Sequence, residues 1–353
     1  MPQSSDPPVI VRETGHLGHL ILNRPAAINA LTAEMVGILR RALAEWAVAD
    51  RIRTVLITGA GERGLCAGGD LRAMHADAVS GGTGSLGFWA DEYRLNATIA
   101  AYPKPVVALM DGLVMGGGIG VSAHASLRVV TERSRLAMPE TGIGFHPDVG
   151  GSWLLAHAPG RIGTHLALTG GTIGAADAIT AGLADDYVPA GRLADLTLLL
   201  AHGDAAGAVA SCAAPPPPGN LATSRDWIDP CYAADSVADV VERLAGHPDP
   251  AAQAAAKEIG AKSPTSLAVT LRSVRAAATL PGLLAALDQE YRLSAALLRL
   301  PDLAEGIRAQ IIDKDRRPRW RPATIADVPA ELVDACFAPI EQAPDLDPAT
   351  PAR

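Results

Sequence analysis

Two glycine-rich turns, each following a strand-like run, limit the folds that are open to this chain. The first turn, residues 66–70 (CAGGD), follows the run at 54–58, and the second, residues 115–120 (MGGGIG), follows the run at 105–110. Each pattern is typical of a strand, a turn and a helix in that order, and strands and helices continue to alternate until about Val188. This alternation predicts an α/β fold built in layers.

The same glycines indicate a site where backbone N–H groups stabilise negative charge on a ligand. Because glycine has no side chain, its backbone N–H group can approach a ligand atom closely, and a helix N-terminus adds a favourable dipole for negative charge. Two such turns facing one oxygen atom would form an oxyanion hole, a pair of donors that stabilises developing negative charge. Each turn taken alone is better explained as a tight connection between a strand and a helix.

The segment at 138–151 (MPETGIGFHPDVGG) places two carboxylates among Gly, Pro and apolar residues. Removal from water penalises the charged form of a carboxylate, so the pKa values of Glu140 and Asp148 are expected to rise. Carboxylates with a raised pKa are typical of a general base or a nucleophile. The alternative is structural: Glu140 caps one helix and Asp148 begins the next.

Five short motifs in a fixed order resemble the crotonase (enoyl-CoA hydratase/isomerase) superfamily. They are LNRP at 22–25, NAL at 29–31, CAGGD at 66–70, MGGG at 115–118 and PE at 139–140. The resemblance covers residues 9–200 and implies a spiral core of ββα units. It also implies that Gly69 and Gly117 donate their N–H groups to the carbonyl of an acyl-CoA thioester. The contacts of coenzyme A that it implies are Arg24, Ala27, Arg63, Ala67 and Asp70.

The chain departs from the hydratases of that superfamily at one catalytic position. One of the two catalytic glutamates of the hydratases matches Glu140, but the other matches Gly120. A glycine has no side chain that can act as an acid or a base. This departure argues against hydration of a double bond.

A narrower resemblance is to the thioester hydrolases of the superfamily. The matching runs at 92–96 and 138–151 imply an acid pair, Glu140 and Asp148, and a substrate-pocket acid, Glu92. Together with Gly117, these three acids are the implied substrate contacts. The C-terminal third carries further matching runs, at 227–229, 262–267, 290–294, 305–308, 312–315 and 318–320. His146 is a local departure, which either tunes the acid pair or only belongs to the pocket wall or the surface.

These assignments imply hydrolysis of a short β-hydroxyacyl thioester such as that of 3-hydroxyisobutyryl-CoA, a step of valine breakdown. Glu140 either attacks the carbonyl or deprotonates water, and Asp148 either bonds the 3-hydroxyl group or passes a proton to the leaving thiolate. Two alternatives stay open: isomerisation or hydration of an enoyl-CoA, and acyl-CoA binding without catalysis. Coenzyme A enters as part of the substrate, and no separate cofactor is expected.

The composition along the chain predicts four parts. Residues 9–200 are expected to form the acyl-CoA core, and residues 201–222, with four successive prolines, a stiff linker. Residues 223–340 show helical periodicity interrupted by prolines. We expect this region to pack over the active site; the alternative is an appendage that only builds oligomer contacts. Residues 341–353 contain few apolar residues and are expected to be disordered.

Net charge and cysteine content limit the binding partners, metal sites and cellular locations that we expect for the chain. The net charge of −8 argues against nucleic acid, and no run reaches the ~18 apolar residues of a membrane span. The four cysteines form no CxxC or Cys/His cluster, so no metal site is expected. Scattered cysteines and an N-terminus without the layout of a signal peptide predict a cytoplasmic protein. The resemblance implies an acyl-CoA partner and a homo-oligomer, a trimer or a hexamer.

Overall fold

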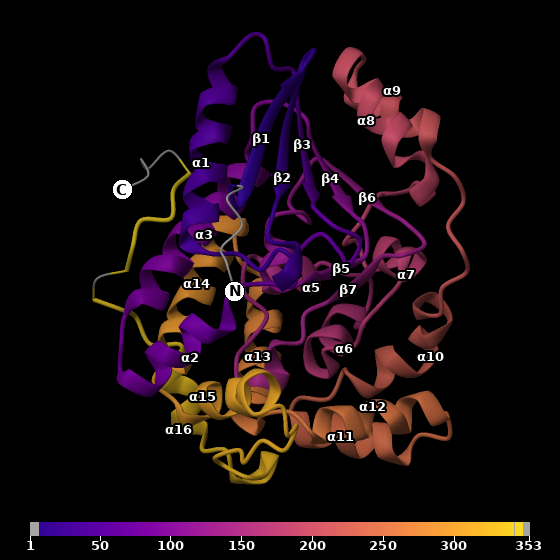
Figure 1. Cartoon of the computed structure of the whole chain (residues 1–353). Helices are drawn as coiled ribbons and strands as arrows, with labels where there is room; N and C mark the ends of the chain where they lie inside the picture. The colour runs from indigo at the N-terminus through magenta and orange to yellow at the C-terminus, as the bar shows by residue number, and fades with distance from the viewer. Residues whose placement is uncertain (1–6, 342, 349–353) are drawn as a thin grey trace.

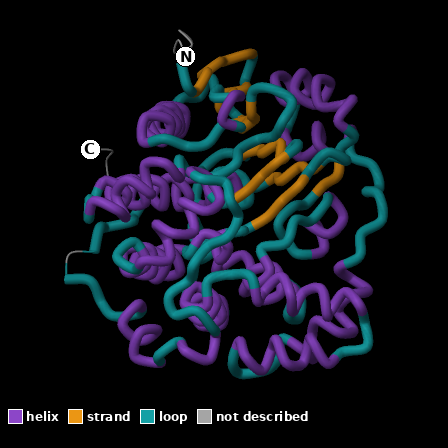
Figure 2. The backbone as a smooth tube through the Cα atoms, turned by 60° about the horizontal axis from the view of Figure 1, so that its bottom comes forward, coloured by secondary structure: helices purple, strands orange, loops and turns teal. Residues whose placement is uncertain are grey.

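The computed structural model describes residues 7–341 and 343–348, and its first half is built around a β-sheet. Among these residues, six strands pair in the order β1-β2-β3-β4-β6-β8, while β5 and β7 form a small second sheet. β1 and β2 are antiparallel, and the other pairs are parallel. Figure 2 shows the strands gathered on one side of the molecule. The strands are β1 (Val9–Thr14), β2 (Leu17–Leu22), β3 (Thr54–Gly59), β4 (Val106–Met110), β5 (Leu113–Met115), β6 (Leu127–Val130), β7 (Arg135–Ala137) and β8 (Asp186–Tyr187).

The central strands of the large sheet are buried on both faces, to which successive side chains along a strand point in turn. On β4, Val106 belongs to the main hydrophobic core, whereas its neighbour Val107 belongs to a smaller cluster on the opposite face. β4 is buried along its whole length, as expected for a parallel strand that is covered on both sides. Val107 pairs in register with Leu56 of β3, which belongs to the same smaller cluster.

Helices cover both faces of this sheet. α1 (Ala33–Val48) packs on β1 and β2 and begins after Thr32, whose side-chain oxygen accepts a hydrogen bond from the Met35 amide. On the opposite face, α8 (Leu193–His202) and α9 (Ala205–Cys212) supply Leu196 and Val209 to the smaller cluster. The remaining helices of this part are η1 (Pro25–Ala27), α2 (Leu71–Ser80), α3 (Gly84–Ala100), α4 (Gly117–Gly120), η2 (Glu140–Ile143), α5 (Gly151–Ala156), α6 (Ile162–Thr169), α7 (Ala175–Thr180) and η3 (Ala190–Arg192).

The chain beyond residue 220 is helical and packs on the first part. Figure 1 shows these helices, orange to yellow, below and beside the sheet. α13 contacts α5 and α6, α14 contacts α3 and α5, and α15 contacts α2 and η2. One hydrophobic core therefore contains residues of both parts, such as Leu20 and Leu267. The elements are α10 (Leu221–Cys231), α11 (Val237–Gly246), α12 (Pro250–Gly260), α13 (Pro264–Ala277), α14 (Leu283–Leu297), α15 (Pro301–Ile307), η4 (Arg308–Ile312), η5 (Ile325–Asp327) and α16 (Ala330–Cys336).

Two expected boundaries differ from those of the structure. The linker expected at 201–222 is shorter, because α9 occupies its first half and α10 begins at Leu221. The tail expected to be disordered is packed in its described part: Leu346 is 3% exposed, and Arg94 Nε donates to Asp345 O at 2.7 Å. Residues 342 and 349–353 lie outside the described residues.

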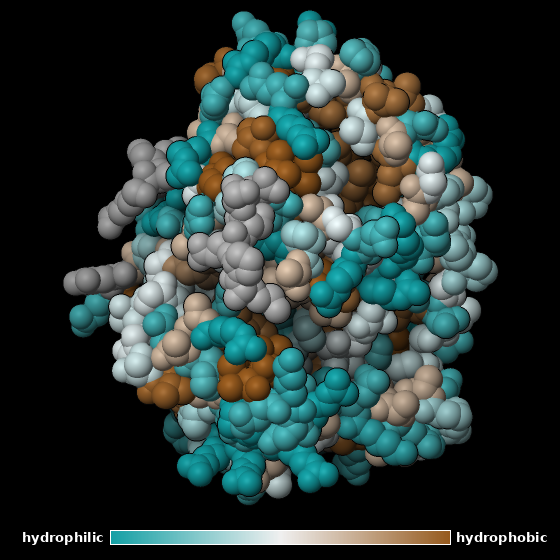
Figure 3. Space-filling view, viewed as in Figure 1, coloured by the Kyte–Doolittle hydropathy of each residue, from teal (hydrophilic) through white to brown (hydrophobic). Residues whose placement is uncertain are grey.

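The outer surface is mainly polar in the view of Figure 3, where hydrophilic side chains cover the lower end of the molecule and apolar patches are small. No helix in the described ranges is both long enough and apolar enough to cross a membrane. In those same ranges, no cluster of three or more His, Cys, Asp or Glu side chains is placed to hold a metal ion.

Candidate active site

The two glycine turns lie side by side because backbone hydrogen bonds join the segments that carry them. Cys66 N donates to Leu113 O at 3.2 Å, and Met115 N donates to Cys66 O at 3.0 Å. The second turn leads directly into α4, which begins at Gly117. The turns touch there: a Cβ atom placed on Gly68 would lie 3.7 Å from Gly117 N.

The N–H groups of Gly69 and Gly117 are available to a ligand, because neither donates a hydrogen bond to another residue in the described part of the chain. A side chain at either position would displace the end of a neighbouring side chain. A Cβ atom on Gly117 would lie 2.5 Å from Glu92 Oε1, and one on Gly69 would lie 2.7 Å from Met74 Cε. Both glycines border the same cavity.

This cavity has a volume of about 370 Å³ and combines the glycine turns with carboxylates. The residues expected from the sequence that line it are Ala67, Gly69, Glu92, Gly117, Glu140 and Asp148. Apolar side chains, among them Met74 and Phe145, complete the side near the core. Lys262, Gln310 and Ile311 come from the chain beyond residue 220, so the C-terminal region supplies part of the wall.

Three buried carboxylates share this space. Glu92, Glu140 and Asp148 are each at most 6% exposed. Burial raises the pKa of Asp148 to about 7, and burial together with the charge of Asp148 raises the pKa of Glu92 and of Glu140 well above the ordinary range. Like charges so close together are not all ionised at once, so the group retains protons near neutral pH. Among the described residues, Glu92 Oε1 and Glu140 Oε2 have no hydrogen-bond partner, which leaves them available to a substrate.

Asp148 does not begin a helix with its side chain, contrary to the structural alternative. Its Oδ2 is instead hydrogen-bonded to Tyr93 Oη at 2.8 Å. The N-terminus of α5 is capped by Glu290 of α14, which accepts hydrogen bonds from Gly150 N at 2.6 Å and from Ser152 N at 2.9 Å. Burial raises the pKa of this buried glutamate to about 8. A residue from the C-terminal region thus holds the segment that presents Asp148.

Val149, between the acid and the cap, is held in an uncommon backbone conformation. Its φ angle is +54°, which is rare for a β-branched residue and costs free energy. The hydrogen bond of Gly150 N to Glu290 follows directly after it, and His124 Nε2 lies 2.8 Å from Val149 O. Strain of this kind persists only where surrounding contacts impose it, and these two contacts hold the backbone directly after Asp148.

His146 lies neither at the surface nor in the cavity wall, where the sequence suggested it. The residue is fully buried, and burial lowers the pKa of its ring to about 3, so the ring is neutral. Its Nε2 lies 3.0 Å from Ser294 Oγ, and its Nδ1 lies 3.1 Å from Pro147 O. Ser294 Oγ in turn lies 2.8 Å from Tyr93 Oη. His146 is therefore connected to the acid pair through two hydroxyl groups.

Most of the expected coenzyme A contacts lie beside the first turn and outside the cavity. They are Arg24, Ala27, Arg63 and Asp70. Arg24 Nη2 lies 3.5 Å from Asp70 Oδ2, and Arg63 Nη1 donates to Ala26 O at 3.4 Å. These residues border the N-terminal loop, which is joined to the turn by a hydrogen bond from Ala67 N to Ile28 O at 2.9 Å. Their role in binding coenzyme A stays a prediction.

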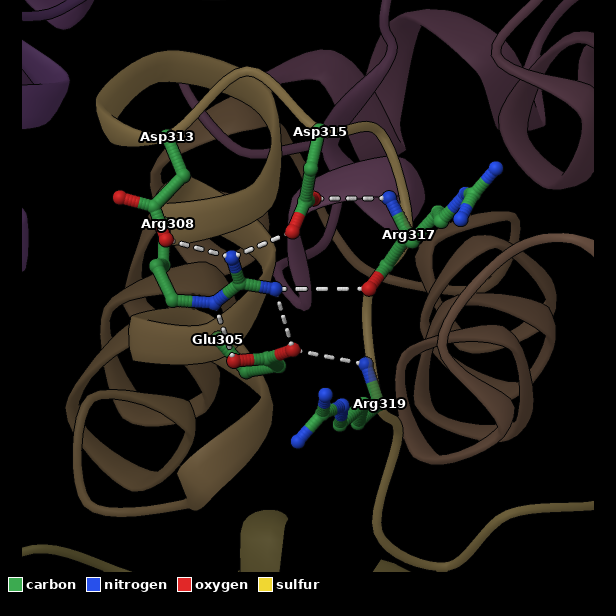
Figure 4. A network of polar contacts seen from close by, with 6 residues as sticks. All are labelled: Glu305, Arg308, Asp313, Asp315, Arg317 and Arg319. Atoms are coloured by element: carbon green, nitrogen blue, oxygen red, sulfur yellow. Dashed lines mark hydrogen bonds and ion pairs between the residues drawn. The ribbon is translucent and has the colours of Figure 1, made fainter.

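A network around Arg308 holds the C-terminal wall in place (Figure 4). Its guanidinium donates to Glu305 at 2.8 Å, to Asp313 at 2.7 Å and to Asp315 at 2.8 Å. Glu305 also accepts from Arg319 N at 2.8 Å. The network thus ties α15, η4 and the following loop together. The η4 turn inside it carries Gln310 and Ile311 to the cavity.

Sequence reasoning assigned no role to Tyr93, Glu290 and Ser294, although all three fall in runs that carried the resemblance. One signal was present: Glu290 and Ser294 are four residues apart, and this spacing places two polar side chains on one face of a helix. Both are fully buried in the structure. Two polar residues at this spacing can share one buried polar contact on a single face of the helix.

Comparison with known proteins gives one family. A family model described as enoyl-CoA hydratase/isomerase matches residues 17–337. A protein of Gallus gallus named 3-hydroxyisobutyryl-CoA hydrolase, mitochondrial, is 37% identical and covers 94% of this chain and 89% of its own length. The protein of the same name from Danio rerio is also 37% identical and covers 95% of this chain and 90% of its own length.

Solved structures confirm the expected fold, an α/β crotonase-like core followed by a mostly helical C-terminal region. The crystal structure of a carnitinyl-CoA dehydratase from Mycobacterium thermoresistibile has a TM-score of 0.94 and 50% identity, and covers 98% of this chain and 99% of its own. That of an enoyl-CoA hydratase from Rhodobacter sphaeroides 2.4.1 has a TM-score of 0.90 and 42% identity, and covers 95% of this chain and 98% of its own.

The expected cytoplasmic location is wrong on this comparison. The relatives from Gallus gallus, Danio rerio and Rattus norvegicus are all named as mitochondrial proteins. Free, scattered cysteines indicate a reducing environment, and they do not distinguish one reducing compartment from another.

Proposed function

The chain belongs to the enoyl-CoA hydratase/isomerase family, and from this premise we propose that it hydrolyses the thioester of 3-hydroxyisobutyryl-CoA or of a similar short β-hydroxyacyl-CoA. The observation that carries the proposal is the pair of buried acids, Glu140 and Asp148, in one cavity with the available N–H groups of Gly69 and Gly117. Relatives named for this reaction match nearly the whole chain, including its C-terminal region.

The thioester carbonyl binds between the two glycine turns. Its oxygen accepts hydrogen bonds from Gly69 N and Gly117 N, and these bonds strengthen as negative charge develops in the tetrahedral intermediate. Loss of one such donor typically costs about 3 kcal/mol of transition-state stabilisation. The contact between the turns at Gly68 supports this placement, because both turns line one cavity.

Glu140 supplies the attack on the carbonyl carbon, either directly or through a water molecule that it deprotonates. The partner-free Oε2 atom of its buried carboxyl supports this role, since the atom is held for a ligand rather than for the fold. Asp148 faces the same cavity and transfers a proton to the leaving thiolate. General acid–base catalysis of this kind is worth about 10²–10⁴ in rate.

Glu92 recognises the hydroxyl group of the acyl chain. Its Oε1 atom is buried without a partner and lies against Gly117. A site that is built to bond a hydroxyl group rejects the analogue that lacks it, because the buried polar atom of the site then stays unpaired. A cavity of about 370 Å³ suits a short acyl chain.

Hydration or dehydration of a carbon–carbon double bond is the competing function, since the two solved relatives are named for such reactions. The surroundings of Gly120 argue against it. A Cβ atom there would lie 2.7 Å from Val149 Cβ and 2.8 Å from Asn96 Nδ2, so the site has no room for a second catalytic glutamate.

Thiol release from a panel of acyl-CoA esters tests the proposal. The protein is expected to release CoA from (S)-3-hydroxyisobutyryl-CoA with a kcat/KM at least ~10² above that for isobutyryl-CoA, which differs only by the missing hydroxyl group. Crotonyl-CoA and carnitinyl-CoA are the control substrates. If either is hydrated or dehydrated efficiently and no ester releases thiol, the proposal is wrong.

A further inference from the structure

Asp148 stands at one end of a chain of hydrogen bonds that runs from the core into α14 and back. Tyr93 Oη lies 2.8 Å from Asp148 Oδ2 and 2.8 Å from Ser294 Oγ. Ser294 Oγ lies 3.0 Å from His146 Nε2, and His146 Nδ1 lies 3.1 Å from Pro147 O. None of the four side chains is more than 6% exposed, so bulk water does not break the chain.

The backbone carbonyls of Pro147 and Glu290 both face the ring of His146, and the direction of the other bonds follows if Nδ1 donates to Pro147 O. A carbonyl oxygen only accepts, so the contact with Pro147 O is a hydrogen bond only if His146 Nδ1 carries the hydrogen atom, and the neutral ring then leaves Nε2 as an acceptor. Ser294 donates its one hydrogen atom to Nε2 and therefore accepts from Tyr93. Tyr93 donates its one hydrogen atom to Ser294 and therefore accepts from Asp148. With a neutral ring, all four contacts are hydrogen bonds only if the carboxyl group of Asp148 is protonated.

We propose that Tyr93, Ser294 and His146 are positioning residues that hold one proton on Asp148, so that Asp148 is the proton donor of the active site. That Asp148 donates its proton in thioester hydrolysis rests on the proposed function. That Asp148 carries a proton is a statement about the ligand-free protein.

The chain has one other consistent state, in which the proton has moved to His146 and the three bonds between Asp148 and His146 are reversed, while Nδ1 still donates to Pro147 O. Burial disfavours that state, because it would place a charged ring and a charged carboxylate in the interior. Burial lowers the pKa of His146 to about 3 and raises that of Asp148 to about 7, so both groups favour the state with the proton on Asp148.

The acids around Asp148 fit this assignment. Glu92 from α3, Glu140 from η2 and Glu290 from α14 face Asp148, and Lys262 lines the same cavity. A negative charge on Asp148 raises the pKa of all three glutamates. A neutral Asp148 removes that repulsion and makes Glu140 easier to ionise, as a nucleophile or base requires.

The proton then has a defined path through the reaction. When the carbon–sulfur bond breaks, the O–H bond of Asp148 breaks as an S–H bond forms on the leaving thiolate, and the negative charge passes to the carboxylate. Tyr93 can turn its hydrogen atom toward this carboxylate. The water molecule consumed in hydrolysis returns one proton to Asp148, directly or through Glu140. The sum is thioester and water giving acid and thiol.

The tautomer of His146 tests the proton count without any turnover. In the ligand-free full-length protein at neutral pH, ¹⁵N NMR is expected to find hydrogen on Nδ1 and none on Nε2. The signal is assigned by its loss in His146→Leu. A ring with hydrogen on Nε2, or on both nitrogens, overturns the proposal.

The pKa of Asp148 in variants is the second test, followed by ¹³C NMR of aspartate carboxyl groups and assigned with Asp148→Asn. Ser294→Ala frees Tyr93 to donate to the ionised carboxylate, so this pKa is expected to fall by about one unit or more, the worth of one hydrogen bond to a charged group. His146→Leu frees Ser294 to donate to Tyr93 and is therefore also expected to lower the pKa of Asp148. Tyr291→Phe is the control, since this ring packs edge-on against Tyr93 at 6.4 Å but its hydroxyl group is outside the chain. No change, or a rise, in both test variants overturns the proposal.

Thiol release separates this proposal from the proposed function. If the enzyme hydrolyses the thioester, the fall of kcat at high pH is expected to begin at lower pH in Ser294→Ala than in the wild type and to stay in place in Tyr291→Phe. Hydrolysis with an unmoved pH profile and an unmoved Asp148 signal overturns the proton chain alone. The expected tautomer and shifts without hydrolysis of any ester overturn the proposed function alone.

Discussion

Replacement of Asp148 by Asn is expected to change how the stability of the fold depends on pH. In the unfolded chain the carboxyl group titrates near its ordinary pKa of 3.8, whereas burial raises the pKa in the folded protein to about 7. Between these values the folded state binds more protons than the unfolded state, so the free energy of unfolding falls as the pH rises. This loss of unfolding free energy is absent below the lower pKa, grows between the two pKa values, and is complete above the higher one.

The two pKa values set the size of the effect. The difference between 3.8 and about 7 corresponds to on the order of 4 kcal/mol. An asparagine cannot ionise, and its amide group can donate to Tyr93 Oη as the protonated acid does. Relative to the variant, the wild type is therefore expected to lose on the order of 4 kcal/mol of unfolding free energy between about pH 4 and about pH 7.

Urea unfolding followed by far-UV circular dichroism, at matched ionic strength and a series of pH values, measures this difference. Asp226→Asn, on the exposed side of α10, controls for the loss of one negative charge. The reasoning is refuted if the difference between wild type and Asp148→Asn stays constant across the pH range. It is also refuted if the unfolding free energy of the wild type increases relative to that of the variant as the pH rises, since that result means a lowered pKa of Asp148 in the folded state.

Three further changes follow from the site. Glu140→Gln is expected to lower kcat for thiol release by about 10² or more with CoA affinity unchanged in calorimetry, because a base or nucleophile is lost; near-wild-type turnover would remove Glu140 from the mechanism. Gly117→Val places a Cβ atom 2.5 Å from Glu92 Oε1 and is expected to abolish hydrolysis in a protein that circular dichroism finds folded, so retained thiol release contradicts the oxyanion assignment. Glu290→Gln removes one of the hydrogen bonds that Glu290 accepts, such as that from Gly150 N, and is expected to cost about 1–3 kcal/mol in urea unfolding; an unchanged midpoint would mean that the cap does not stabilise the fold.

The elements that the amino-acid sequence predicts well are those whose signals are local. The glycine turns follow strand-like runs within a few residues, and the same short motifs carry Gly69 and Gly117. Glu140 and Asp148 stand out because apolar residues, Gly and Pro surround them along the chain. Where the local signal was weak, the prediction failed: the small residues of α9, at 205–212, read as part of a linker, yet they fit closely against the sheet.

The network that controls Asp148 has no local signal. Tyr93 and Ser294 are 201 residues apart, and Ser294 and His146 are 148 residues apart, so their hydrogen bonds exist only because α14 docks on α3 and α5. Spacing along a chain indicates which residues share a face of a helix, but it does not indicate which distant face will cover them. Burial by that docked helix is also what moves the pKa of His146 and of Asp148 in opposite directions. The residue types at the site are written in the sequence, whereas the protonation of each acid depends on what the folded chain packs around it.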